Sequence, residues 1–171
     1  MAKMSYTRTA EFMQQCNDPV GEAFRAMSRE RERRYHPAQH FDVELDRLAR
    51  STARRAADEL GIGRPAAVRW FYELDYSEPE RVTLSGVAFP YYAAIYLNTG
   101  LKRADDVRWT AAHETAHLAG SAYDSEDTAD GFAARFTGQQ GCTVTRASGD
   151  DIQWLPSCAP VNTNYWELRT A

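Results

Sequence analysis

The chain has 171 residues, of which 43% are hydrophobic and 26% are charged, and its formal net charge is −4. This length predicts one domain, and the composition is that of an ordinary globular protein that can bury a core without disulfides or structural metal. A slightly negative chain gives no electrostatic reason to expect a nucleic acid or an anionic membrane as partner.

No segment that would export or anchor the chain can be recognised. The first residues, MAKMSYTRTAEFMQQ, contain no apolar run of signal-peptide length, and no stretch approaches the ~18 apolar residues of a transmembrane helix. Cys16, Cys142 and Cys158 are few and odd in number, which favours free thiols over a disulfide framework, although the last two could pair. We therefore expect a cytoplasmic protein.

The first part of the chain, residues 1–65, is expected to be helical. Asp18-Pro19 is a capping and first-turn signal for a helix over residues 20–34. A second helix is predicted from about residue 41 to residue 60, where apolar residues recur at helical spacing until Gly61.

The period of the pattern changes in residues 66–136. Segments rich in β-branched and aromatic residues predict three short strands in one antiparallel or mixed sheet, at residues 67–74, 81–89 and 93–98. Helices are expected over about 104–119 and 125–136, each with acidic residues in its first turn. Residues 137–171 indicate no regular element, so this segment is expected to be irregular.

The clearest chemical signal is H-E-T-A-H at residues 113–117. On a helix, His113 and His117 lie one turn apart on one face, where two imidazole nitrogens can bind one Zn²⁺ at ~2.0–2.1 Å. Glu114 then lies beside the metal without binding it, and it can take a proton from zinc-bound water. The alternative is a helix with two histidines and no metal. The small apolar residues around the motif are typical of a buried helix and favour the zinc site.

A catalytic zinc needs a third protein ligand and an open fourth position. Glu126 is the best candidate, because the connection after His117 is long enough for the chain to reverse and return the next helix to the metal. Asp130 lies one turn further on the same face and could accept a hydrogen bond from a ligand histidine. Both carboxylates can also be explained as acidic residues that complement a helix dipole.

Two further roles stay open in the sequence. The side chain that would stabilise an oxyanion opposite the zinc could be Tyr123, Arg135 or Tyr165. The predicted strand 93–98 is either an edge strand that holds an extended peptide or a core strand.

H-E-x-x-H followed by a helix with E-x-x-x-D resembles the gluzincin group of zinc metallopeptidases. Within that group, HETAH…EDTADGFAARF is similar to the ImmA/IrrE-type metallopeptidases, whose ligand glutamate begins an E-x-x-A-[ND]-x-F-A segment. The matching positions are Glu126, Ala129, Asp130, Phe132 and Ala133. The resemblance covers residues 93–136 and implies a zincin-like fold, Zn²⁺ as cofactor, and an intracellular endopeptidase that acts on a regulatory or partner protein.

Two other zincin groups stay open as alternatives. H-E-T-A-H-L-A-G also matches the start of the metzincin pattern, in which the third ligand would fall on Tyr123, a poor zinc ligand. The aspzincin group uses an aspartate after a similarly short connection, which would favour Asp124 or Asp127. Neither alternative accounts for the match that follows Glu126, so Glu126 is the preferred ligand.

The sequence thus predicts one α+β domain of zincin-like architecture over residues 1–171, with N-terminal helices, a three-stranded sheet, the H-E-x-x-H helix and a ligand helix. We expect His113, His117 and Glu126 to bind zinc, and Glu114 to activate water for hydrolysis of a protein or peptide substrate. The alternative is a zincin-fold module that binds zinc and a protein partner without turnover. Glu114 argues against it, because structural zinc sites close the fourth position and have no use for a base.

Overall fold

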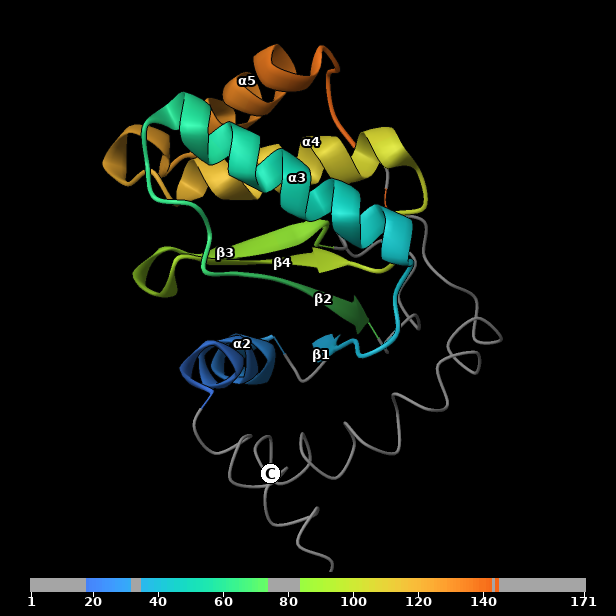
Figure 1. Cartoon of the computed structure of the whole chain (residues 1–171). Coiled ribbons are helices and arrows are strands. Elements are labelled where there is room, and N and C mark those ends of the chain that lie inside the picture. The colour runs from blue at the N-terminus through green and yellow to red at the C-terminus, as the bar shows by residue number, and fades with distance from the viewer. Residues whose placement is uncertain (1–17, 32–34, 74–83, 143, 145–171) are drawn as a thin grey trace, which may run out of the picture.

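The computed structural model describes residues 18–31, 35–73, 84–142 and 144, and this part of the chain has a mixed α+β fold (Figure 1). One face of a sheet is covered by α2 (Pro19–Glu30), and the other by α3 (Val43–Leu60) and α4 (Ala104–His117). Helix α5 (Glu126–Thr137) packs against α4. None of the described helices is both long and apolar enough to span a bilayer.

Within the described residues the sheet has four strands in the order β1-β2-β4-β3. Their bounds are β1 (Tyr35–Pro37), β2 (Ala67–Glu73), β3 (Gly86–Phe89) and β4 (Ala94–Asn98). Strands β2 and β4 pair in parallel, whereas β1 and β3 are antiparallel to their neighbours. Every residue of β4 is buried, as expected for a central strand that is covered on both faces.

The prediction of a three-stranded sheet is wrong, because Tyr35–Pro37 forms an additional strand. Three residues that include a proline carry no periodic signal, so only tertiary contacts define β1. Tyr35 is buried and its ring packs edge-on against Phe71, with 5.4 Å between centroids. Helix α2 accordingly ends at Glu30, earlier than predicted, and the segment 1–65 is not wholly helical.

The remaining predicted elements lie close to their observed bounds. The helices predicted over 41–60, 104–119 and 125–136 correspond to α3, α4 and α5, each within two residues at either end. The last two predicted strands correspond to β3, which begins at Gly86, and to β4. Residues 74–83 and 145–171 lie outside the described part, so the irregular C-terminal segment stays a prediction.

The edge of the sheet that faces α4 is β3, and the predicted strand at 93–98 is therefore a core strand. The amide of Asn98 donates to the carbonyl of Ser85 at 2.9 Å, so Ser85 forms a hydrogen-bonded pair with β4. Hydrogen-bonded and non-hydrogen-bonded residues alternate along an antiparallel strand, which makes Gly86 and Ala88 non-hydrogen-bonded residues of β3. The backbone groups of Gly86 and Ala88 consequently point away from β4. No strand in the described ranges pairs with them.

Apolar side chains fill both faces of the sheet, because successive residues of a strand point to opposite sides. On the α2 face, aromatic rings dominate, from Phe24, Tyr35, Phe71 and Tyr96. On the other face, larger side chains of the sheet meet small residues of α3 and α4: Trp70, Ile95 and Leu97 pack with Ala49, Ala53 and Ala111. These alanines let both helices approach the sheet closely.

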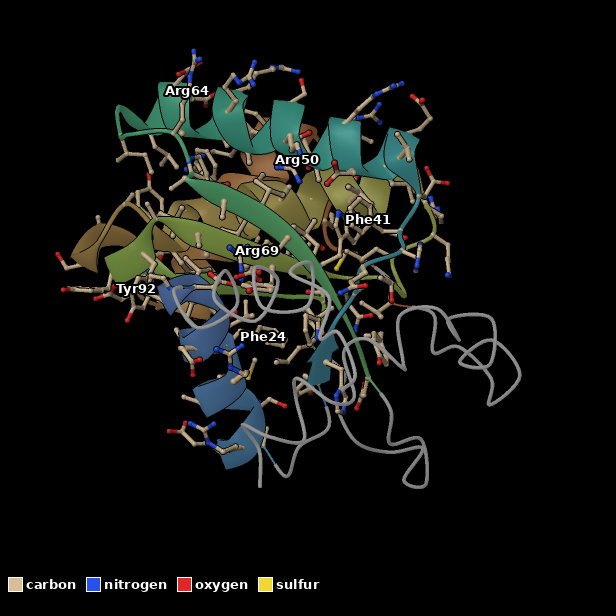
Figure 2. All side chains as sticks on the ribbon, turned by 60° about the horizontal axis from the view of Figure 1, so that its bottom comes forward. Phe24, Phe41, Arg50, Arg64, Arg69 and Tyr92 are labelled. Carbon is tan, nitrogen blue, oxygen red and sulfur yellow. The ribbon has the colours of Figure 1, made fainter. Side chains whose placement is uncertain are left out.

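Helix α2 is tied to the sheet by one carboxylate. Asp18 caps the helix by accepting from the amide of Gly21 at 3.1 Å, and Arg69 of β2 donates two hydrogen bonds to it, at 2.6 and 3.0 Å. Arg69 also donates to the hydroxyl of Tyr96 at 3.1 Å. Figure 2 shows Arg69 and Phe24 where α2 meets the sheet. Burial alone would raise the pKa of Asp18, but Arg69 more than offsets it and holds that pKa below its usual value.

We expect Asp18→Asn to lower the free energy of unfolding by about 1–2 kcal/mol at neutral pH, because it removes the ion pair with Arg69 and keeps a capping side chain. A depressed pKa stabilises the folded state only while the carboxylate is ionised, so the difference should shrink as the pH falls below ~3.9. Urea unfolding at several pH values measures it. Asp42→Asn is the control, since Asp42 caps α3 through Glu44 and Leu45. Equal losses of unfolding free energy in Asp18→Asn and Asp42→Asn would contradict the stabilising role assigned to the ion pair between Asp18 and Arg69.

Candidate metal centre

Helix α4 carries H-E-T-A-H in its last turns, where it lies between the sheet, α3 and α5. His113 and Glu114 are buried, which is unusual for charged or polar side chains without a partner or a function. The helix ends at His117, and the chain then reverses at Gly120, whose φ of 81° favours glycine. A short 3-10 turn, η2 (Ser121–Tyr123), leads to α5, which Ser125 caps.

The reversal brings Glu126 back to the two histidines. The Nε2 atoms of His113 and His117 lie 3.1 Å apart. The carboxylate of Glu126 lies 3.1 Å from Nε2 of His113 and 3.7 Å from Nε2 of His117. Tetrahedral zinc with ligands at ~2.0–2.1 Å separates the ligand atoms by roughly 3.3 Å, a value that these spacings bracket. Within the described ranges, these three side chains form the one such group that could hold a metal ion.

The second nitrogen of each ring faces an oxygen atom. Nδ1 of His117 lies 2.8 Å from the carbonyl oxygen of Tyr123, and Nδ1 of His113 lies 2.8 Å from Oδ1 of Asp130. The second contact has the distance of an ion pair without the alignment of a hydrogen bond. Because an oxygen atom faces each Nδ1, the ring hydrogen of each neutral histidine is favoured on Nδ1 rather than on Nε2. With the hydrogens on Nδ1, the lone pairs of both Nε2 atoms would point at each other and at Glu126, an arrangement that a cation between them would stabilise.

Glu114 is held against the edge strand rather than against the histidines. A Cβ at position 86 would lie 2.6 Å from Cγ and Oε1 of Glu114, so only glycine fits at that point of β3. Burial raises the pKa of Glu114 well above its usual value, and the negative charge of Glu126 raises it further. A divalent cation next to Glu114 opposes both effects, so we expect this carboxyl to ionise when metal is bound.

Trp109 forms a wall of the site that the sequence did not single out. Its ring stacks on His113 with 5.0 Å between centroids and 24° between planes. The sequence indicates only that its tryptophans belong to the core or to a pocket wall. The spacing holds a more specific signal, because Trp109 lies four residues before His113 and therefore on the same helix face.

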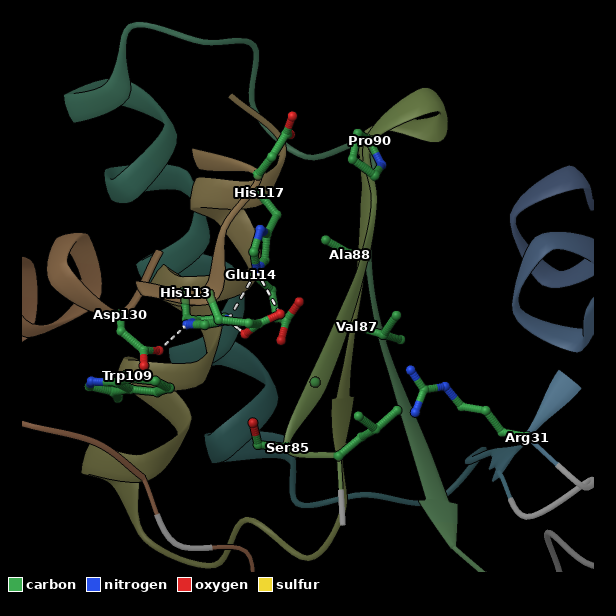
Figure 3. Close-up of a pocket in the computed structure, with 14 residues that line it drawn as sticks. Arg31, Ser85, Val87, Ala88, Pro90, Trp109, His113, Glu114, His117 and Asp130 are labelled. Carbon is green, nitrogen blue, oxygen red and sulfur yellow. Dashed lines mark hydrogen bonds and ion pairs between the residues drawn. The ribbon is translucent and has the colours of Figure 1, made fainter. Parts of the chain in front are cut away.

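A cavity of about 550 Å³ opens beside the cluster (Figure 3). Its size falls in the range of sites that take a ligand or a short peptide segment. The histidines, Glu114 and Glu126 line one side, and residues 84–88 with Pro90 line the other. The side chain of Glu126 is 80% exposed, so the cluster is open to solvent from this cavity.

The other acidic candidates occupy different places. Asp124 lines the cavity but does not belong to the group of three that could hold a metal. Asp127 neither lines the cavity nor belongs to that group. Asp130 lines the cavity and contacts His113, as the sequence indicated for a carboxylate that orients a ligand. The geometry therefore favours Glu126 as third ligand over its rivals.

Two of the candidates for an oxyanion stabiliser, Tyr123 and Arg135, do not have their side chains at the cluster. The ring of Tyr123 packs edge-on against Phe132, at 5.8 Å between centroids, and neither Tyr123 nor Arg135 lines the cavity. Tyr165 lies outside the described residues, so this role stays open.

Cys142 carries a free thiol, whereas Cys16 and Cys158 lie outside the described residues.

Comparisons of the chain with models of protein families, with curated proteins and with solved structures found no match. The resemblance to gluzincins and to the ImmA/IrrE-type metallopeptidases therefore rests on the motif residues, and it stays a prediction.

We expect the protein to bind one Zn²⁺ and Glu126→Gln to weaken this binding by more than about 100-fold, because the variant loses a ligand. Asp130→Asn should weaken it by roughly 10- to 100-fold, as changes next to a ligand histidine do. Competition with a chromophoric chelator measures both. Asp127→Asn is the matched control and should bind zinc as the wild type does. A larger loss in Asp127→Asn or Asp124→Asn than in Glu126→Gln would contradict the ligand assignment.

In metal-free protein, we expect Glu114→Gln to raise the free energy of unfolding, and the gain should grow as the pH rises above ~4.3, the usual pKa of a glutamate. The folded protein keeps a proton on Glu114 that the unfolded chain releases above ~4.3, so wild-type stability falls with pH in this window. Denaturant titrations in a chelator measure the difference. Glu59→Gln, on the exposed face of α3, should show no such trend. A gain that is independent of pH would contradict the buried, protonated state.

Proposed function

We propose that this chain is a zinc-dependent metalloendopeptidase that hydrolyses peptide bonds of a protein substrate. The observation that carries the proposal is the convergence of His113, His117 and Glu126 beside the buried carboxyl of Glu114. Two imidazoles and one carboxylate are the donor set of a large class of catalytic zinc sites, and three protein ligands leave a fourth position for water or substrate.

Glu114 favours catalysis over a structural role for the metal. A bound zinc would acidify a water molecule and polarise the scissile carbonyl. Glu114 would take the proton from the attacking water and deliver it to the leaving amine. Its contact with Gly86 and its burial hold the carboxyl in one place, and a fixed position is what general-base catalysis needs.

The shape of the site supports an extended peptide as substrate. The outward-pointing backbone groups of Gly86 and Ala88 belong to residues that line the same cavity as the two histidines. A peptide that adds to this edge as a further strand would run past Glu114 and present its carbonyl groups to the cluster. A compact small molecule would leave these backbone groups unused.

The resemblance to ImmA/IrrE-type metallopeptidases makes the proposed fold, substrate and location in the cell more specific. It favours a zincin-like fold and an endopeptidase that cuts a regulatory or partner protein inside the cell. The small, odd number of cysteines and the free thiol of Cys142 favour the cytoplasm.

We expect zinc-loaded wild type to cleave members of a broad peptide library and Glu114→Gln to be slower by roughly 10²- to 10⁴-fold, because it lacks the base but keeps the ligands. Mass spectrometry of the products measures cleavage, and metal analysis shows that the variant keeps its zinc. Chelation should abolish cleavage and added zinc should restore it.

Two outcomes would change this assignment. If zinc-loaded wild type and Glu114→Gln are both inert on the library, the enzyme proposal fails and the zinc-binding interaction module is the better description. If both cleave at the same rate, Glu114 is not the base.

A further inference from the structure

The cavity beside His113, His117 and Glu126, called the metal cluster below, continues around the open edge of β3 to the end of α2. Arg31, the residue that follows α2, lines it together with the histidines (Figure 3). In the close-up, the guanidinium group of Arg31 lies beside Val87, on the side of β3 opposite to Glu114. One continuous space therefore touches the metal cluster on one face of the sheet and a positive charge on the other.

The two faces of β3 explain how a single peptide would meet both. Gly86 and Ala88 face α4, where Gly86 lies against Glu114 and Ala88 packs with the core of that face. Val87 faces α2, with the aromatic cluster of Phe24. Residues directly opposite each other in paired strands point to the same side. In a peptide paired with β3, the residue opposite Val87 would therefore point toward Arg31, and its two neighbours would point toward the metal cluster.

Arg31 is suited to receive a charged side chain. It is exposed, and no carboxylate within the described ranges forms an ion pair with it. Of the residues that line the cavity in the described part of the chain, it is the one with a permanent positive charge, whereas the metal side carries Asp124, Glu126 and Asp130. A guanidinium can donate two parallel hydrogen bonds to one carboxylate. A lysine in place of the arginine, or an amide in place of the carboxylate, does not reproduce this pair of bonds.

We infer that Arg31 is a specificity residue, which selects an aspartate or glutamate of an extended peptide bound along β3, within two residues of the scissile bond. This inference rests on the proposed function, and it adds the chemical class of the substrate. The peptide chain supplies the backbone pairing, the metal cluster receives the scissile carbonyl, and Arg31 receives the carboxylate on the opposite face.

The test uses zinc-loaded full-length protein and peptides blocked at both ends, so that every carboxylate belongs to a side chain. Each position around the cleavage site is varied between Glu, Gln and Lys, and kcat/KM is measured. At one position, wild type should prefer Glu over Gln by roughly threefold to tenfold at low salt, and the preference should shrink as salt screens the pair. Arg31→Glu should reverse it and prefer Lys.

The matched control is Arg54→Glu, which makes the same change of charge on the exposed face of α3, on the other side of the sheet. It should keep the wild-type preference. Circular dichroism and zinc content show that each variant is folded and loaded. If wild type cleaves peptides but Arg31→Glu selects the same residues as wild type does, the inference is wrong and the proposed function stands.

Binding of the same blocked peptides to zinc-loaded Glu114→Gln, measured by fluorescence polarisation, separates the two ideas further. Binding that prefers Glu and depends on Arg31, without cleavage by wild type, supports the carboxylate subsite and overturns the peptidase. Absence of both binding and cleavage overturns both.

Discussion

The side chains of His113, His117 and Glu126 converge at one place at the end of α4, where the two Nε2 atoms lie 3.1 Å apart and the carboxylate lies 3.1 Å from Nε2 of His113. Oxygen atoms of Tyr123 and Asp130 orient the two rings from behind. Small residues of α4 let it pack closely between its neighbours. The reversal at Gly120 then returns Glu126 to the cluster. Together these features bring three side chains that could hold a metal ion to one point.

Much of this arrangement could be predicted from the sequence because it is local. The same-face placement of His113 and His117 is a property of any helix, whereas the need for a third ligand left Asp124 and Asp127 open beside Glu126, which the family resemblance preferred. Helix α3 was recognisable from its apolar periodicity and from Gly61, and α4 and α5 from the acidic residues in their first turns. Local patterns of this kind carry their information within a single turn or a single loop.

The parts that could not be predicted depend on pairing between distant segments. Strand β1 exists because Tyr35 docks against β2, and the order β1-β2-β4-β3 makes β3, rather than β4, the edge beside the cluster. The close approach of Gly86 to Glu114 depends on that order as well. No spacing in the sequence encodes which strand is outermost, so the wall of the cavity became visible only in three dimensions.

The cavity is assembled from segments with separate origins in the chain. The candidate metal ligands and Glu114 all lie between His113 and Glu126, whereas the opposite wall comes from β3 and from Arg31 at the end of α2. Apart from Gly86, which lies against Glu114, residues of this wall can therefore change without displacing the candidate metal ligands on α4 and α5. Such a division makes the scaffold evolvable: descendants of one ancestral protein can change what the cavity admits while they keep the same group of candidate ligands, and protein engineers can exploit the same freedom.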